Sequence, residues 1–212
     1  MKVKICGIRT LEEARLAIDA GADALGFLVD VGEAKCAVGT ATASAIISGL
    51  PPFVSSVVVS TSTDSKALIR LAKATGANTL QLQGPVTPDI IRAVKAVFFN
   101  MKVYAAVHVA DGSALENARE LGEAADAIIL DSADKGALGG TGKVHDWDIS
   151  KQIVEASSLP VILAGGLNPE NIAEAVRKVR PYAVDVRTGV SNPDGSKDIE
   201  KVRLFIERAK SA

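Results

Sequence analysis

The chain has 212 residues, a length that suits one large domain or two small ones. Its 24 basic and 25 acidic residues give a formal net charge of -1, so bulk charge gives no support for a nucleic-acid or anionic-membrane binder. Hydrophobic residues make up 48% and charged residues 23%, a globular composition that argues against disorder. Aromatic residues are only 4%, which favours interleaved helices and strands around an aliphatic core.

The first residues and the two cysteines indicate in which cellular compartment the protein is expected. Met1-Lys2-Val3-Lys4-Ile5 contains no long apolar run, and no stretch approaches the roughly 18 apolar residues of a membrane span. We therefore expect no signal peptide, no membrane partner and a cytoplasmic location. Cys6 and Cys36 are too few for a disulfide scaffold, and a disulfide between them is disfavoured in a reducing compartment.

Short apolar runs alternate with helical patterns along the whole chain. The runs are continuous and many are β-branched, which is typical of strands buried on both faces of a parallel sheet. The predicted strands cover residues 3–6, 24–29, 55–59, 79–82, 102–107, 127–130, 161–164 and 183–186.

Each predicted strand is followed by a predicted helix. The first helix begins after Thr10, with Glu13 completing a capping box, and Asn168-Pro169 supplies a cap before the seventh. The second helix has the weakest pattern and is predicted from topology. The predicted helices cover residues 11–20, 41–50, 65–75, 90–97, 115–124, 149–157, 170–179 and 199–209.

Eight strand–helix pairs predict an α/β fold, a single (β/α)₈ TIM barrel over residues 1–212. A doubly wound open sheet is the alternative, but it needs fewer units, and no G-x-G-x-x-G follows the first strand. The longest irregular stretches are predicted at residues 30–40 and 131–146. Both follow strands, so we expect them at the carboxyl ends of the barrel strands, where such enzymes place their active sites.

Two side chains at strand ends could exchange protons with a substrate. Cys6 ends the first strand beside Gly7. It is either a small core residue or, if its pKa is lowered, a nucleophile or base. Asp131 follows three apolar residues at the end of the sixth strand. It either caps the loop or, with a pKa raised by an apolar mouth, donates a proton.

Glycines after the seventh and eighth strands predict an anion site. At Gly165-Gly166 a strand runs into two glycines and a capped helix, a pattern that exposes backbone N–H groups. Thr188-Gly189 follows the eighth strand, and phosphate sites of barrels commonly use these two loops. Asp185 ends the eighth strand, where it could hold a substrate hydroxyl or cap the local backbone.

Three further features have weaker patterns. The cluster Gly139-Gly140-Thr141-Gly142 predicts either a flexible turn or a flap over bound substrate. His108 and His145 have no metal-ligand spacing, and we interpret both as structural or exposed. No cluster of Cys, His and carboxylate residues in the sequence indicates a metal site.

Six segments occur in the order found in one known enzyme family: Lys4-Ile5-Cys6-Gly7-Ile8, Gln81-Leu82-Gln83-Gly84, Leu130-Asp131-Ser132, Gly139-Gly140-Thr141-Gly142, Ala164-Gly165-Gly166-Leu167-Asn168-Pro169-Glu170-Asn171 and Val184-Asp185-Val186. Over nearly its whole length the chain resembles phosphoribosylanthranilate isomerases. The resemblance implies a (β/α)₈ barrel of tryptophan biosynthesis. It implies conversion of N-(5′-phosphoribosyl)anthranilate to an aminodeoxyribulose phosphate by an Amadori rearrangement, without a cofactor.

The resemblance also implies roles for individual residues. Cys6 matches the family's general base and Asp131 its general acid. Asp185 matches a carboxylate near the sugar hydroxyls. The matches to the phosphate-binding loops are Gly165, Gly166, Thr188 and Gly189.

Three positions depart from the family pattern. Where the family has Ser-Pro-Arg in the second loop, Lys35 could replace the arginine that faces the anthranilate carboxylate, as a point charge without a fork. Gln83 stands in place of a histidine and can hydrogen-bond but not titrate. Arg187 stands in place of a serine, where it could contact the carboxylate or strengthen the phosphate site.

Three other functions remain open. One is another phosphosugar isomerase of the histidine-pathway type, which typically uses two aspartates. The others are a phosphate-binding barrel without catalysis and a partner-binding protein, for which no apolar stripe with helical period is found. The combination of Cys6 and Asp131 favours the isomerase, acting on a small phosphoribosyl substrate as a monomer or homodimer.

Overall fold

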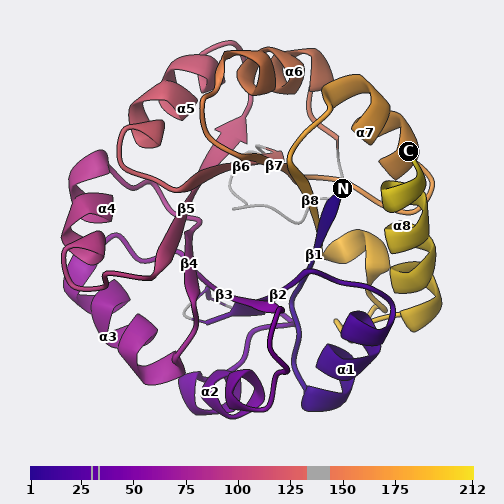
Figure 1. Ribbon diagram of the computed structural model, residues 1–212, viewed down its shortest axis with the longest axis horizontal. Coiled ribbons are helices and arrows are strands. Elements are labelled where there is room, and N and C mark those ends of the chain that lie inside the picture. The colour runs from indigo at the N-terminus through magenta and orange to yellow at the C-terminus, as the bar shows by residue number, and fades with distance from the viewer. Residues whose placement is uncertain (30, 33, 133–143) are drawn as a thin grey trace.

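The computed structural model of the chain describes residues 1–29, 31–32, 34–132 and 144–212. Within these residues eight parallel strands close into a barrel in sequential order, and β8 pairs with β1 (Figure 1). The predicted (β/α)₈ barrel is therefore confirmed. The strands are β1 (Lys2–Cys6), β2 (Ala24–Leu28), β3 (Ser55–Ser60), β4 (Thr79–Leu82), β5 (Lys102–Val109), β6 (Ala127–Ser132), β7 (Val161–Leu163) and β8 (Ala183–Val186).

The helices that follow the strands form the outer ring in Figure 1. A short 3₁₀ helix, η1 (Thr188–Val190), lies between β8 and the last of them. Over the described residues, no helix is long and apolar enough to cross a membrane. The α-helices are α1 (Leu11–Asp19), α2 (Thr40–Ser48), α3 (Ser65–Thr75), α4 (Pro88–Lys95), α5 (Ala114–Gly122), α6 (Trp147–Ala156), α7 (Ile172–Val179) and α8 (Ile199–Ser211).

One helix start and one helix cap differ from their predictions for identifiable reasons. Helix α7 begins two residues later than predicted, because residues 169–171 form a turn whose N–H groups at 170 and 171 donate to Asn168 Oδ1 at 2.9 and 3.0 Å. At α1, Thr10 Oγ1 accepts from the Glu13 N–H at 3.1 Å, as predicted. The Glu13 carboxylate, however, accepts from the Arg9 N–H at 2.7 Å, so only half of the capping box forms.

Strand side chains alternate between the helix layer and the barrel interior. Outward residues such as Ile5, Phe27 and Leu130 join the main core with the helices. Inward residues such as Ile129 and Ile162 fill the barrel interior. Other inward positions are buried but polar, and they line the route from the core to the barrel mouth: Lys4, Gln81, Gln83 and Asp185.

Candidate active site

A cavity of about 590 Å³ lies at the carboxyl ends of the strands, a size suited to a small-molecule ligand. It is lined from the ends of β1, β4, β6 and β8 and from the loop after β7. The structure thus brings together every predicted site residue except Lys35: Cys6, Gln83, Asp131, Gly165, Gly166, Asp185, Arg187, Thr188 and Gly189. The cluster Gly139-Gly140-Thr141-Gly142, predicted as a flap, lies outside the described residues.

Asp131 is held in place by donors on both of its oxygens. The Ser132 N–H donates to Oδ1 at 2.8 Å, and Gln83 Nε2 donates to Oδ2 at 2.9 Å. Burial raises the pKa of Asp131, while the Ser132 N–H, His108 and Arg187 oppose the rise. The direction is the one a general acid needs, since a higher pKa keeps the carboxyl group protonated nearer to neutral pH.

Cys6 is buried at the end of β1, and its surroundings act on the pKa of the thiol in opposing directions. Burial raises the pKa of the thiol above its usual value, while the positive charges of Lys4, Arg187 and Lys197 oppose the rise. The sequence points to a nucleophile or base only on condition of a lowered thiol pKa, and in the resting site the desolvation of this small side chain outweighs three nearby cations. Cys6 and Cys36 are both free thiols and lie in one buried cluster.

A buried ion pair lies beneath Cys6. Lys4 Nζ and Asp185 Oδ1 are 2.9 Å apart, and their side chains are 3% and 9% exposed. The pairing of β1 with β8 places these two residues side by side. Burial opposes the charge of Lys4, but Asp185 and Cys6 more than offset this and raise the pKa of Lys4 to about 12.

The loop after β7 presents backbone N–H groups to the cavity. Gly165 and Gly166 adopt positive φ angles of +78° and +66°, which favour glycine. A Cβ on Gly165 would collide with Ser132 and lie 3.1 Å from Asp131 Oδ1. Within the described part of the chain, the N–H groups of Gly165 and Gly166 donate to no protein group. They are therefore available to an anion.

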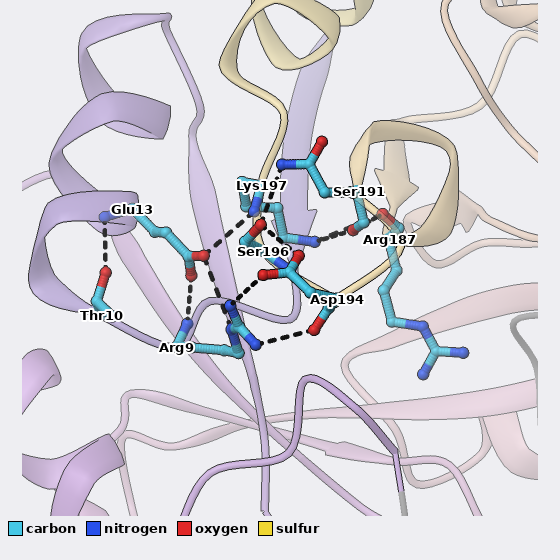
Figure 2. A network of polar contacts seen from close by, with 9 residues as sticks. Arg9, Thr10, Glu13, Arg187, Ser191, Asp194, Ser196 and Lys197 are labelled. Carbon is cyan, nitrogen blue, oxygen red and sulfur yellow. Dashed lines mark hydrogen bonds and ion pairs between the residues drawn. The ribbon is translucent and has the colours of Figure 1, made fainter.

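The two candidate cations for a substrate carboxylate are placed differently. Lys35 Nζ donates to the Pro193 carbonyl at 2.9 Å, and Lys35 does not line the cavity. Arg187 lines the cavity, and its side chain leans toward β1, with Cγ 3.4 Å from the position of a Cβ on Gly7. Its guanidinium points away from the polar network in Figure 2 and has no ion-pair partner among the described residues.

That network joins the loop after β8 to the start of α1 (Figure 2). Lys197 Nζ donates to Ser191 Oγ at 2.8 Å and to the Arg187 carbonyl at 3.4 Å. The Lys197 N–H donates to Glu13 Oε1 at 3.1 Å, and Arg9 Nη1 donates to the Asp194 carbonyl at 3.1 Å. The backbone at Arg187 is thereby tied to the helix that follows Cys6.

Both histidines have structural partners, as interpreted from the sequence. His108 pairs with Asp131 in the β5–β6 register and donates from Nε2 to the Gln83 carbonyl at 3.1 Å. His145 lies between two hydroxyls, with Ser132 Oγ 3.1 Å from Nδ1 and Ser150 Oγ 2.7 Å from Nε2. Burial lowers the pKa of His145 to about 4, so its imidazole is neutral at physiological pH.

Sequence reasoning missed two lysines near Cys6. Lys4 had a detectable signal, because a charged residue at an inward position of a strand buried on both faces needs a partner. Lys197 had no such signal, since it lies in a loop whose path only the structure shows.

Comparison with known proteins agrees with this geometry. The sequence profile of the family described as N-(5'phosphoribosyl)anthranilate (PRA) isomerase matches residues 3–208. The N-(5'-phosphoribosyl)anthranilate isomerase of Methanocella arvoryzae is 41% identical over 209 residues, covering 99% of this chain and 98% of that protein.

Solved structures give the same result. One contains monomers of the dimeric phosphoribosylanthranilate isomerase of Thermotoga maritima, with a TM-score of 0.87, 32% identity and full coverage of both chains. Another is a phosphoribosyl anthranilate isomerase in complex with reduced 1-(o-carboxyphenylamino)-1-deoxyribulose 5-phosphate, with a TM-score of 0.86, 32% identity and full coverage of both chains. The chain belongs to the N-(5'-phosphoribosyl)anthranilate isomerase family.

Proposed function

We propose that the cavity isomerises N-(5′-phosphoribosyl)anthranilate to 1-(2-carboxyphenylamino)-1-deoxyribulose 5-phosphate in tryptophan biosynthesis. The observation that carries this proposal is the presence of one thiol and one carboxyl group, Cys6 and Asp131, in a cavity that also exposes two free backbone N–H groups. An Amadori rearrangement needs one acid and one base close to the sugar, together with an anchor for the phosphate.

Asp131 acts first, as the general acid. Its proton passes to the ribose ring oxygen as the bond from that oxygen to C1 breaks, and the anthranilate nitrogen forms a Schiff base with C1. The carboxylate that results accepts hydrogen bonds from the Ser132 N–H and from Gln83 Nε2. Two donors that already face Asp131 stabilise the charge without reorganisation.

Cys6 acts second, as the general base. Its thiolate removes the proton from C2 of the sugar, the electron pair moves to the C1–N linkage, and the enolamine tautomerises to the ketone. The pKa values of Cys6 and Asp131 are both raised by burial. The reactive form has the acid protonated and the thiol ionised, a minor form whose share grows as the thiol pKa falls.

The remaining residues hold the substrate. The N–H groups of Gly165 and Gly166, with Thr188 and Gly189 beside them, receive the phosphate, and remote binding orients the sugar. Arg187 binds the anthranilate carboxylate. The Cγ of Arg187 lies beside Gly7, the residue that follows Cys6, and this position near the proposed base supports the role.

The sugar itself contacts two further side chains. Asp185 and Gln83 line the cavity, where the ionised Asp185 can accept a hydrogen bond from a sugar hydroxyl and the Gln83 amide can donate or accept one.

A fluorescence progress curve with freshly generated phosphoribosylanthranilate tests the proposal. The wild type should consume the substrate, and both Cys6→Ser and Asp131→Asn should be nearly silent, since each proton transfer typically contributes about 10²–10⁴-fold. A silent wild type that still binds phosphate analogues would contradict the assignment, and the histidine-pathway aminoaldose would be assayed next. Full activity of Cys6→Ser would show that the base is a different group.

We also infer the organisation of the working enzyme. Residues 1–212 act as one domain, since β1 and β8 close the barrel and α8 contacts both β1 and α1. The enzyme works as a monomer or homodimer in the cytoplasm. A biosynthetic role fits that compartment, and so do two free thiols, because the cytosol keeps thiols reduced. Light scattering on a size-exclusion column decides between the two oligomeric states, and a larger assembly would contradict the inference.

A further inference from the structure

Lys4 is a buried lysine that the acid–base steps above do not use. It occupies an inward position of β1, two residues before Cys6, and is 3% exposed. Its only ion-pair partner among the described residues is Asp185, 2.9 Å away. A buried charge is costly even when paired, so a lysine kept here calls for a reason beyond packing.

Gly26 shows how close the ammonium group lies to the thiol. A Cβ on Gly26 would lie 2.6 Å from Cys6 Sγ and 3.0 Å from Lys4 Nζ. Both atoms therefore lie over the same glycine on the neighbouring strand, within reach of strong electrostatic interaction. Because Gly26 on β2 has no side chain, there is room beside it for both the ammonium group and the thiol.

Besides Lys4, three charged side chains and a second thiol surround Cys6. Asp185 on β8 opposes ionisation of the thiol, whereas Arg187 and Lys197, both in the segment after β8, favour it. Cys36, from the loop after β2, is a second buried thiol in the same cluster. Arg187 lines the cavity, and the Lys197 ammonium group is bound to Ser191 and the Arg187 carbonyl. Lys4 is thus the cation that an ion pair with Asp185 holds in place next to the thiol.

We propose that Lys4, fixed by its ion pair with Asp185, is a positioning residue that stabilises the Cys6 thiolate during turnover. The proposal rests on the assignment of Cys6 as the base under the proposed function. Asp185 holds the ammonium group in place and keeps it protonated, so Lys4 acts as a permanent charge and not as a proton donor. The positive charge is already in place beside Cys6, so it stabilises the thiolate without any movement of the protein.

This role has a measurable consequence for catalysis. Only the form with ionised Cys6 and protonated Asp131 reacts, so each pH unit by which Lys4 lowers the midpoint of Cys6 ionisation multiplies the reactive fraction by about ten. Replacement of Lys4 by a neutral residue should therefore shift the thiol titration upward and reduce kcat/KM by the same factor.

The experiment measures the thiol directly. In the Cys36→Ser background Cys6 is the sole cysteine of the chain. The rate of its alkylation by iodoacetamide is followed against pH for the parent, Lys4→Met and Lys4→Arg. Lys2→Met is the matched control, because Lys2 lies on the same strand and pairs with Asp23 at 2.7 Å, but at the exposed end.

The proposal expects an alkylation midpoint at least about one pH unit higher in Lys4→Met, with a tenfold or larger loss of kcat/KM. Lys4→Arg and Lys2→Met should keep the parent midpoint. Should Lys4→Met fail to give the far-ultraviolet circular dichroism of the parent, Lys4→Gln, which can still donate to Asp185, replaces it.

The possible failures are distinguishable. An unchanged midpoint in folded Lys4→Met or Lys4→Gln, with Cys6→Ser inactive, would overturn the role of Lys4 and leave the proposed function intact. Full activity of Cys6→Ser would instead overturn the assignment of the base. A lower kcat/KM without a shift of the thiol midpoint would make Lys4 a structural residue only.

Discussion

Gln83 Nε2 donates a hydrogen bond of 2.9 Å to Asp131 Oδ2, so an amide at the end of β4 holds the carboxyl group at the end of β6. The amide cannot flip without losing a second bond, because Gln83 Oε1 accepts from Gln81 Nε2 at 2.8 Å. A histidine at this position could change its charge with pH, whereas the glutamine presents the same donor at every pH. The acid is therefore tuned by burial and by fixed donors.

The loss of this donor should move the acidic limb of the pH profile. In Gln83→Leu, the ionised form of Asp131 loses a hydrogen bond, and its pKa rises further. Hydrogen bonds to charged groups are worth about 1.5–3 kcal/mol, so the acidic limb of kcat/KM should move up by about one to two pH units. A pH series of initial rates on wild type and Gln83→Leu measures the shift. An unmoved limb would show that Gln83 does not act on Asp131.

The wild-type profile should have a broad plateau with two limbs. Below the pKa of Asp131 both groups are protonated, and above the pKa of Cys6 both are ionised; neither form reacts. Burial raises the pKa of Asp131 above the usual 3.8 and that of Cys6 above the usual 9.0, so both limbs should lie above these values. Initial rates across the pH range locate them, and an alkaline limb below the usual thiol value would contradict this picture.

Arg187 should contribute to recognition of the aromatic carboxylate. In Arg187→Met, binding of the reduced product analogue should weaken about 10–100-fold, as expected for the loss of about 1.5–3 kcal/mol. The matched ligand is the same analogue without the carboxylate on the ring, and calorimetry with it should show little difference between the two proteins. Equal losses for both ligands, accompanied by weaker binding of inorganic phosphate, would assign Arg187 to the phosphate site.

Much of the fold could be predicted because its signals are local. Continuous apolar strands, caps such as Thr10 at α1 and the strand–helix count all lie in neighbouring residues, and the barrel follows from them. The strand ends then placed Cys6 and Asp131 at one mouth without any knowledge of contacts. The structure agrees with these predictions.

Long-range properties could not be predicted in the same way. The thiol pKa depends on how much water reaches Cys6, which depends on residues from β1, β2, β8 and two loops. The position of Lys35 depends on the path of the loop that carries Pro193, more than 150 residues away in the chain. The register that brings Lys4 beside Asp185 likewise joins the two ends of the chain, and no local pattern encodes it.

Gly165 should be intolerant of any side chain. Its φ of +78° disfavours other residues, and a Cβ would collide with Ser132 and crowd Asp131 Oδ1. In Gly165→Ala the loop must shift away from Asp131, so kcat/KM should fall and phosphate should bind more weakly. Gly112→Ala is the control, since a Cβ there meets nothing within 4 Å. Wild-type kinetics in Gly165→Ala would show that the glycine loop has no part in the site.

His145 should make the protein sensitive to acid. Its imidazole is buried between Ser132 and Ser150, and burial lowers its folded-state pKa to about 4, from the usual 6.5. The unfolded chain therefore binds a proton at a higher pH than the folded chain does. The stability contributed by neutral His145 is complete above about pH 6.5 and is lost as the pH falls toward 4, at about 1.4 kcal/mol per unit and about 3 kcal/mol in all.

Urea unfolding at several pH values between 7 and 4 measures this loss. The wild type should lose about 3 kcal/mol of unfolding free energy more than His145→Asn, which has no proton to take up in this range. Carboxylates that titrate in the same range cancel in the comparison, because both proteins contain them. Parallel loss in the two proteins would mean that the imidazole takes up its proton at the same pH in the folded and unfolded chains, and would contradict a lowered pKa for the buried His145.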